Sequence, residues 1–376
     1  MGNVPHLRFP EFTEEWKETK LGKIAEITKG SGISKDRLSE YGSPCILYGE
    51  LYTKYKSEII NEVYSRTELD SSLLVKSKAN DVIIPCSGET AIDISTARCV
   101  PFNNILLGGD LNIIRLKNND GGFFAYQLNG TRKKDIARVA QGVSVVHLYG
   151  ENLKHIRVYH PAIEEQKKIT RLLSLIDKRI ATQNKIIEDL KKLKSAISER
   201  LFNAIKGDVV VLEDIGDVVK GKQINGEFLS ESGKYYVMNG GIEPSGFYND
   251  YNVEANTISI SEGGNSCGYV QFNACPFWSG GHCYTIQNTT DNVKTEYLYQ
   301  FLKSKESEIM KLRIGSGLPN IQKKDLAKFK ITIPNISEQK VISAFLSSFE
   351  RKADVEMNFV NLLLEEKQYL LRQMFI

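Results

Sequence analysis

The longest regular pattern of apolar positions lies between Pro161 and about Ile205. Apolar residues recur there at alternating steps of four and three, the heptad spacing of a helix that buries one seam against a partner helix. The seam contains Ile169, Leu173, Ile176, Ile180, Ile187, Leu190, Ile197 and Leu201. The pattern therefore predicts one long helix in the middle of the chain.

The same pattern returns at the end of the sequence. A shift of 173 positions places Gln166 on Gln339, Pro161 on Pro334 and Phe202 on Phe375 without a gap. The second seam contains Ile342, Leu346, Phe349, Ala353, Val360, Leu363, Leu370 and Met374. Because such a repeat indicates two copies of one structural unit, we expect a second long helix and a pseudo-twofold arrangement.

The segments before the two helices also share a layout. Short apolar runs bounded by glycines predict strands, such as Asp81–Pro85 in the first segment and Thr257–Ser261 in the second. The turn Lys29-Gly30 corresponds to Lys220-Gly221, and a helix is predicted from Phe123 to about Val139. We therefore predict an α+β protein in which two similar mixed α/β domains are separated by two long helices that form an antiparallel coiled coil. The predicted boundaries are 1–158 for the first domain, 159–207 for the central helix, 208–332 for the second domain and 333–376 for the second helix.

Polar residues interrupt both seams at matching places and suggest a register. Gln183 and Lys194 interrupt the first seam, and Glu356 and Lys367 interrupt the second. An antiparallel register that places Lys194 opposite Glu356 also places Gln183 opposite Lys367, with apolar residues opposite apolar residues. Polar residues in a seam cost stability but fix register; the alternative is that these side chains extend into solvent and encode nothing. Helices of about 40 residues would be roughly 60 Å long and would hold two domains at a set separation.

Composition narrows the class of protein. Hydrophobic residues make up 41% of the 376 residues, which is enough for the cores of two or three domains. The sequence contains no apolar run of membrane-spanning length, and its polar N-terminus lacks a secretory core, so we expect a cytoplasmic protein. The six cysteines form no CxxC pair and are expected as small buried thiols. The net charge of +3 permits nucleic-acid binding without arguing for it.

Sequence motifs for catalysis are missing. An adenine methyltransferase needs an Asn/Asp-Pro-Pro-aromatic tetrad, and the sequence has no Pro-Pro pair. The run from Gly216 to Lys222 resembles a phosphate loop, but Gln223 stands where Ser or Thr would bind magnesium. The spacing of Cys267, Cys275, Cys283 and His282 fits no common zinc pattern. We expect a noncatalytic chain with no cofactor or metal of its own.

Several motifs together carry a family resemblance. They are the N-terminal Val4-Pro5-His6-Leu7-Arg8-Phe9-Pro10 with Trp16, the Leu21-Gly22-Lys23-Ile24 strand opening, the Lys29-Gly30 turn, and the Pro-x-x-x-Glu-Gln-Lys helix start used twice, at Pro161 and Pro334. With them the chain resembles the specificity subunits of type I restriction–modification systems. The resemblance implies two target-recognition domains, the first reading the 5′ half and the second the 3′ half of a split duplex DNA site. It also implies two adenine methyltransferase subunits, which carry S-adenosylmethionine, and restriction subunits, which use ATP and Mg, as partners.

Two kinds of DNA contact are then predicted. Basic residues neutralise phosphates and set the affinity and its salt dependence; the candidates are Lys29, Arg132, Lys133, Lys134, Arg138, Lys220, Lys303, Lys305, Lys311 and Arg313. Donors and acceptors on loops read base edges; the candidates are Ser31, Lys35, Ser87, Glu89, Thr90 and Ser144 in the first domain, and Lys222, Gln223, Asn239, Glu262, Asn265, Ser316 and Asn320 in the second. A solvated surface is the alternative for each basic residue, and turn formation is the alternative for the loop residues.

Two other interpretations remain at this stage. One is a structural coiled-coil scaffold without a DNA role. The other is the recognition module of another type of restriction enzyme, which would require a catalytic domain that this sequence lacks.

Overall fold

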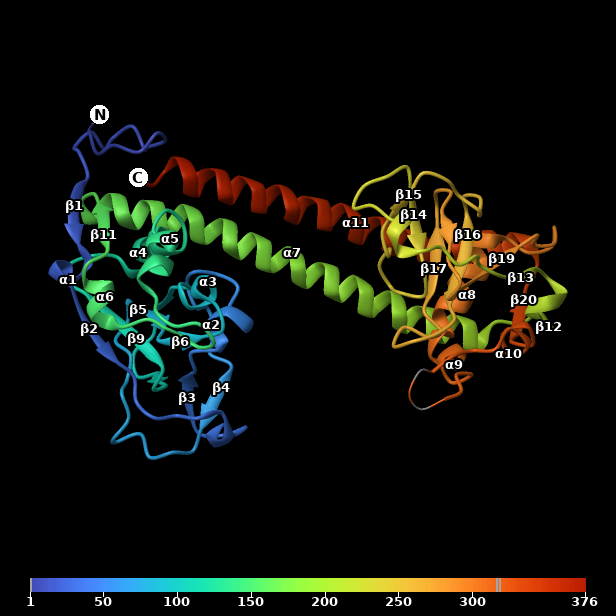
Figure 1. Cartoon of the computed structure of the whole chain (residues 1–376), viewed down its shortest axis with the longest axis horizontal. Coiled ribbons are helices and arrows are strands. Elements are labelled where there is room, and N and C mark those ends of the chain that lie inside the picture. The colour runs from blue at the N-terminus through green and yellow to red at the C-terminus, as the bar shows by residue number, and fades with distance from the viewer. Residues whose placement is uncertain (1, 316, 318) are drawn as a thin grey trace. The chain divides into compact units, whose positions relative to one another are not determined.

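The computed structural model describes residues 2–315, 317 and 319–376, and the chain divides into two compact units. Unit 1 comprises Met1–Asn184 and Asn358–Ile376, and unit 2 comprises Lys185–Met357. The two predicted long helices are α7 (Ile163–Ala204) and α11 (Ile336–Gln373), and each contributes one part to unit 1 and one part to unit 2 (Figure 1). Because the units divide both helices, the predicted domain boundaries stay predictions.

Unit 1 is built around a four-stranded antiparallel sheet with the order β2-β9-β5-β7. A three-stranded sheet, β4-β3-β8, and two strand pairs, β1-β11 and β6-β10, complete its strands. The strands are β1 (Lys17–Lys20), β2 (Ala25–Lys29), β3 (Ser43–Ile46), β4 (Ser65–Thr67), β5 (Asp81–Pro85), β6 (Ser87–Gly88), β7 (Arg98–Val100), β8 (Leu106–Leu107), β9 (Leu111–Leu116), β10 (Val146–His147) and β11 (Arg157–His160). The short helices are α1 (Leu21–Ile24), η1 (Lys35–Arg37), α2 (Glu50–Thr53), α3 (Ala91–Ile94), α4 (Gly121–Asn129), α5 (Lys133–Val139) and α6 (Gly150–Lys154). The helix predicted from Phe123 to Val139 is thus two helices, interrupted at Gly130.

Unit 2 repeats this plan. Its four-stranded sheet has the order β13-β19-β16-β17, its three-stranded sheet the order β15-β14-β18, and β12 pairs with β20. The strands are β12 (Asp208–Val211), β13 (Asp217–Lys220), β14 (Tyr235–Met238), β15 (Phe247–Tyr248), β16 (Thr257–Ser261), β17 (Val270–Asn273), β18 (Trp278–Ser279), β19 (Cys283–Gln287) and β20 (Lys330–Ile333). The short helices are η2 (Leu212–Asp214), η3 (Gly226–Phe228), α8 (Thr295–Ser304), α9 (Glu306–Met310) and α10 (Lys323–Ala327).

The two units share strand directions as well as strand order. In each three-stranded sheet the central strand, β3 or β14, pairs antiparallel with one neighbour and parallel with the other. A Cβ on Gly30 would overlap the carbonyl of Gly108, and a Cβ on Gly221 would overlap the carbonyl of Gly280. The repeated Lys-Gly turn therefore has a steric cause, since only glycine allows this close approach of two loops. The predicted fold class, two similar mixed domains with two long helices, is confirmed.

Equivalent aromatic residues bury one end of each long helix. In unit 1, Phe375 packs against Phe123 and Trp16, with ring centroids 5.1 and 6.2 Å away. In unit 2, Phe202 packs against Tyr297 and Phe301, at 5.8 and 5.3 Å. Phe202 and Phe375 are each 4% exposed. The predicted equivalence of these two residues is therefore confirmed by their surroundings.

The repeated glutamine ties each helix start to its domain. The Gln166 amide nitrogen donates to the Pro161 carbonyl, and its oxygen accepts from the Asp120 backbone N–H, both at 2.9 Å. Gln339 makes the same two contacts, with the Pro334 carbonyl at 2.9 Å and with the Lys294 N–H at 2.8 Å. Both glutamines are buried. A buried amide must satisfy its donors and acceptor internally, which explains why this residue occurs in both copies.

The predicted register, with Lys194 opposite Glu356 and Gln183 opposite Lys367, stays a prediction, while the ion pairs of the two lysines involve other residues. In unit 2, Lys194 Nζ lies 2.7 Å from Glu350 Oε1, and Glu356 accepts from Lys352 of its own helix at 2.5 Å. In unit 1, Lys367 Nζ lies 2.6 Å from both Asp177 and Glu58. The prediction considered only seam positions, whereas Asp177 and Glu350 each follow a seam residue by one position. Long lysine side chains reach along the seam to those carboxylates.

Each unit contains an antiparallel packing of the two helices. In unit 1, Leu173 shares a core with Met374, and Asp177 contacts Lys367. In unit 2, Ile197 and Leu201 pack in the core that contains Leu346.

Within the described ranges, no helix is apolar over a length that would cross a membrane.

Candidate nucleic-acid interface

In unit 2, four loops meet around Gly280-Gly281-His282. The Asn239 side-chain oxygen accepts from the His282 backbone N–H at 3.2 Å, and the Glu262 N–H donates to the His282 carbonyl at 3.0 Å. The Lys222 N–H donates to the Ser279 carbonyl at 2.8 Å, and Asn320 forms a β-bridge with Gly263. Predicted base-reading residues from four separate stretches of sequence thus lie around one loop.

Glu262 is the most constrained residue of this cluster. Its side chain is 5% exposed, and its Oε1 accepts from Lys220 Nζ at 2.7 Å and from the Tyr284 hydroxyl at 3.0 Å. Burial, and then the hydrogen bond to Glu262, raise the pKa of Tyr284, so its hydroxyl stays a donor. Oε2 has no hydrogen-bond partner among the described residues, and His282 Nδ1 lies 3.9 Å from it. Glu262 therefore retains an unused acceptor beside two exposed basic groups.

Unit 1 has the same backbone framework with other side chains. The Cys86 N–H donates to the Asp110 carbonyl and the Leu148 N–H donates to the Cys86 carbonyl, each at 2.7 Å. The same two bonds in unit 2 join Glu262 to His282 at 3.0 Å and Ile321 to Glu262 at 2.8 Å. Cys86 and Asp110 thus stand where Glu262 and His282 stand in the other unit. Because donors and acceptors differ at matched positions, the two units present different chemistry from one scaffold.

The unit 1 loops border a groove of about 710 Å³. Lys35 and Asp110 line it together with apolar residues such as Ile33 and Leu47. The Ser87 hydroxyl donates to Asp110 Oδ2 at 3.2 Å, which places a second predicted residue beside the groove. Sequence reasoning missed Asp110 and His282; the signal that could have found them is the glycine pair that precedes each one, Gly108-Gly109 and Gly280-Gly281.

Some predicted base-reading residues have local structural roles. Thr90 caps α3, because its Oγ1 accepts from the Asp93 N–H at 3.1 Å, and the Ser31 hydroxyl accepts from the Val75 N–H at 2.8 Å. These two fit the turn-forming alternative. The other loop candidates are exposed side chains, namely Glu89, Ser144, Gln223 and Asn265, while Ser316 lies outside the described residues.

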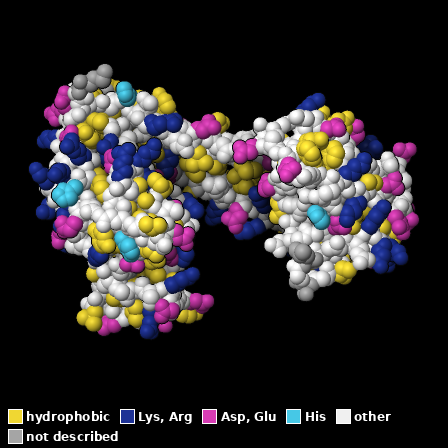
Figure 2. Space-filling view, in the orientation of Figure 1, with side chains coloured by type: hydrophobic (Ala, Val, Ile, Leu, Met, Phe, Trp, Pro, Cys, Tyr) yellow, Lys and Arg dark blue, Asp and Glu magenta, His cyan; other side chains and the backbone are white. Residues whose placement is uncertain are grey.

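The basic candidates separate into tied and exposed side chains. Lys303 Nζ donates to the Val270 carbonyl at 2.9 Å and to Glu306 at 2.5 Å, and Lys305 Nζ donates to Asn203 at 2.8 Å. Lys133 is partly buried, and burial, followed by the charge of Arg98, lowers its pKa. The exposed candidates are Lys29, Lys134, Arg138, Lys220, Lys311 and Arg313, of which Lys220 is paired with Glu262. On the face shown in Figure 2, basic and acidic side chains are interspersed. Phosphate contacts on this face would therefore depend on local basic groups rather than on a single-sign field.

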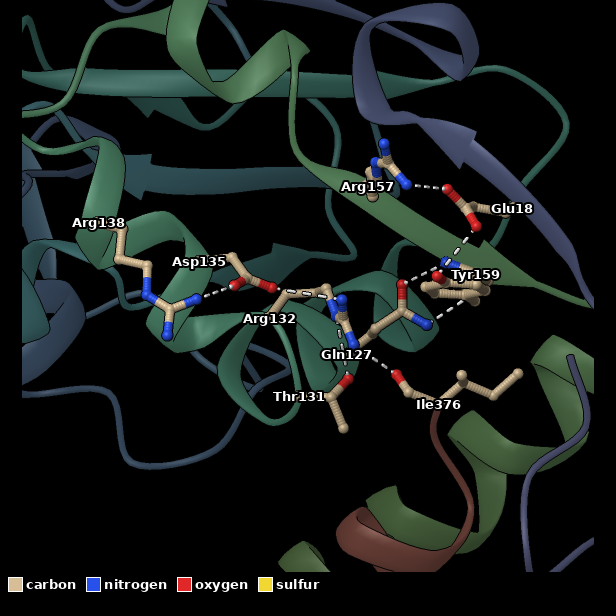
Figure 3. Close-up of polar contacts among 9 residues, drawn as sticks. All are labelled: Glu18, Gln127, Thr131, Arg132, Asp135, Arg138, Arg157, Tyr159 and Ile376. Atoms are coloured by element: carbon tan, nitrogen blue, oxygen red, sulfur yellow. Dashed lines mark hydrogen bonds and ion pairs between the residues drawn. The ribbon is translucent and has the colours of Figure 1, made fainter. Parts of the chain in front are cut away.

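Arg132 anchors the last residue of the chain instead of facing solvent (Figure 3). Its Nη2 donates to the Ile376 carbonyl at 2.7 Å, its Nη1 lies 3.3 Å from Asp135, and its guanidinium lies 5.4 Å from the Tyr159 ring centroid. Arg138 contacts the other oxygen of Asp135 at 3.1 Å but is 75% exposed. Arg132 thus has a structural role, while Arg138 keeps most of its surface available for a phosphate.

The predicted absence of a metal site stays a prediction. Among the described residues, no group of three or more His, Cys, Asp or Glu side chains is placed to hold an ion. Five cysteines are buried as expected, whereas Cys275 is exposed.

Comparison with known proteins agrees with the two-unit organisation. A sequence-family model described as the type I restriction modification DNA specificity domain matches residues 13–192 and again residues 206–363. A putative type I specificity subunit of Mycoplasma pneumoniae is 34% identical over 161 residues. This aligned region covers 42% of the present chain and 42% of that relative. A putative type I restriction enzyme specificity subunit of Methanocaldococcus jannaschii is 23% identical over 401 residues, 94% of this chain and 91% of that protein. A crystal structure of a type I restriction–modification system S subunit from M. genitalium superposes with a TM-score of 0.70 at 19% identity, covering 99% of both chains, and so shares the fold.

Proposed function

The chain belongs to the type I restriction–modification DNA specificity family, and from this membership we propose that it is a noncatalytic subunit that binds an asymmetric, bipartite duplex DNA site. In this proposal unit 1 reads one half of the site and unit 2 reads the other. The observation that carries the proposal is the pair of matched loop clusters, with Cys86 and Asp110 in one and Glu262 and His282 in the other. Two different readers on one scaffold suit a site whose halves differ in sequence.

DNA affinity and base selection would come from different residues. The exposed basic side chains, such as Lys134, Arg138, Lys311 and Arg313, would contact phosphates. The loop side chains around Gly280 and Gly108 would face base edges. The long helices would set the separation of the half-sites, because a continuous helix is a stiff connection.

Partner subunits complete the proposed activity. We expect two adenine methyltransferase subunits, which carry S-adenosylmethionine and flip the target base, and restriction subunits, which use ATP and Mg. Exposed apolar side chains on α11 support a docking surface on the helices: Val341, Phe345, Val355, Leu362 and Tyr369 are each at least 46% exposed. Apolar surface of this kind is typical of a protein interface. Such a complex would act on DNA in the cytoplasm.

Coexpression of the chain with its methyltransferase subunit, followed by genome-wide mapping of adenine methylation, tests this proposal. We expect a two-part motif with a fixed gap. Methylation without a motif, or none at all from an assembled complex, would contradict it. A scaffold without a DNA role would also fail to retain duplex DNA in a sequence-specific, salt-dependent way together with the methyltransferase.

A further inference from the structure

In unit 1, a segment of the chain itself covers the outer edge of the four-stranded sheet. Cys99 of the edge strand β7 donates its N–H to the Glu58 carbonyl at 2.7 Å, and the Ile60 N–H donates to the Cys99 carbonyl at 3.0 Å. Ile59 lies parallel to Cys99 in this bridge. The Glu58 carboxylate reaches Lys367 Nζ at 2.6 Å. The segment therefore adds as a short parallel strand and closes the ion-pair cluster with one carboxylate.

The matching edge in unit 2 is open at Phe272, although side chains cover it at Val270. Phe272 of β17 corresponds to Cys99. Cys99 pairs with Val82, the second residue of β5, and Phe272 pairs with Ile258, the second residue of β16. Val270 directs its backbone outward, since its N–H donates to Glu306 and its carbonyl accepts from Lys303 Nζ, both at 2.9 Å. Residues two apart in a strand direct these groups to the same side, so Phe272 also faces outward. Among the residues that the structure describes, no hydrogen bond covers this outer N–H and carbonyl of Phe272.

A groove of about 630 Å³ in unit 2 is lined by residues that match Lys367, Asp177 and Lys133, the residues around Glu58 in unit 1. Lys194, Gln300, Glu306 and Glu350 line it. The ion pair of Lys194 with Glu350 corresponds to that of Lys367 with Asp177 under the shift of 173 positions. The Asp177 side chain is 7% exposed, whereas that of Glu350 is 34% exposed. The unit 2 pair thus lacks the cover that the Glu58 segment provides in unit 1.

One residue that lines the groove, Gln300, has a buried side-chain oxygen without a hydrogen bond among the described residues. Gln300 is 2% exposed, and its Nε2 donates to Glu350 Oε2 at 3.0 Å, which sets the orientation of the amide. Its Oε1 has no hydrogen-bond partner among the described residues. Lys133, which raises the local positive charge beside Glu58, is replaced at the matching position by Glu306. Four lysines and five carboxylates line the groove, so the charge balance also favours a basic group over a second Glu58-like carboxylate.

We propose that the β17 edge and this groove form a docking site for an extended, basic segment of a protein partner. The segment would add in parallel beside Phe272, as Glu58–Ile60 adds beside Cys99 in unit 1. Its N–H and carbonyl would pair with those of Phe272, and a Lys or Arg side chain would donate to Gln300 Oε1. The inference rests on the internal comparison of the two units, so it holds whether or not the DNA proposal does.

Peptides that copy the covering segment of unit 1 test the proposal on the full chain. The probe is a capped peptide with the sequence of Tyr55–Val63 that carries Glu58→Lys, and binding is measured by isothermal titration calorimetry. We expect saturable one-to-one binding. N-methylation of the Ile60 amide should weaken binding about tenfold, because that N–H would donate to Phe272. N-methylation of Ile59 is the matched control, since the Ile59 N–H makes no bond in the unit 1 bridge, and it should leave the affinity unchanged.

Three further measurements locate the site. The peptide with the original Glu58 should bind more weakly than the lysine peptide, and Gln300→Leu in the protein should reduce the difference between the two. A photoreactive residue in place of Ile60 should crosslink to β17. Equal effects of the two N-methyl groups, equal affinity of the two peptides, crosslinks confined to unit 1, or absence of saturable binding would each overturn the proposal. So would displacement of the peptide by duplex DNA of arbitrary sequence, which would identify the groove as a phosphate site.

Discussion

Lys367 in unit 1 and Lys194 in unit 2 are equivalent residues that make the same kind of contact in different surroundings. Lys367 is held by Asp177 and Glu58, and the Tyr126 hydroxyl donates to Asp177 at 2.6 Å. Lys194 is held by Glu350, which the matching hydroxyl of Tyr299 reaches at 3.3 Å. One cluster is closed and the other is partly open. The helical repeat therefore specifies the ion pair, whereas the domain packed against the helices determines how deeply the pair is buried and so how much it contributes to stability.

The largest expected effect compares Lys367→Met with Lys194→Met. Lys367→Met leaves the buried Glu58 and Asp177 carboxylates without their ion-pair partner, and we expect a loss of about 3–5 kcal/mol in the free energy of unfolding. Lys194→Met should cost only about 1 kcal/mol, because water reaches Glu350. Differential scanning calorimetry of the full chain compares the two variants. Equal decreases in Tm would show that the two clusters do not differ in this way.

A second prediction sharpens the comparison of the two loop clusters. Glu262→Gln changes an acceptor to a side chain that also donates, so it should alter base preference at one position of one half-site by about 1–3 kcal/mol. Cys86→Ser, at the matching place in unit 1, should affect only the other half-site. Methylation motifs from each variant complex provide the measurement. A change in both halves after either substitution would indicate a general loss of structure.

A third prediction compares how the thermal stability of the wild type and of Asp177→Asn in unit 1 depends on pH. Burial, and then the charge of Glu58, raise the pKa of Asp177 above its ordinary value of 3.8. A carboxyl whose pKa is higher in the folded state destabilises the fold as it ionises, so its contribution falls as pH rises above 3.8 through the raised pKa. The Tm of the wild type minus that of Asp177→Asn should therefore decrease over this interval. A difference that stays constant or increases with pH would contradict the assignment.

The smallest expected effect separates two neighbouring arginines. Arg138→Gln should reduce the slope of log affinity against log salt by about 1 if it removes one phosphate contact, with little change in Tm. Arg132→Gln should lower the Tm because it releases the Ile376 carbonyl and Asp135, and the salt slope should stay the same. Fluorescence anisotropy with a duplex, measured on the complex at several salt concentrations, tests both. A changed salt slope for Arg132→Gln together with a lowered Tm for Arg138→Gln would contradict the roles assigned to the two residues.

Local patterns were enough for the framework of this protein. The heptad spacing predicts α7 and α11 because helical periodicity depends on neighbouring residues alone. The second copies of Gln166 and of the Lys29-Gly30 turn reveal the repeat. Each then proves to satisfy a local requirement, a buried amide that ties a helix start to its domain or a close approach of two loops. Such local requirements are visible in the sequence as a particular residue type at a fixed position in both copies.

Only the tertiary structure decided which side chains meet. Lys194 contacts Glu350, Arg132 holds the Ile376 carbonyl, and the Glu58 segment covers an edge in unit 1 whose counterpart in unit 2 is open at Phe272. Each outcome depends on residues far apart in the sequence, and long charged side chains can reach several partners within a few ångströms. Periodicity determines which face of a helix is buried, but the neighbours on that face are set by the packing of the whole unit.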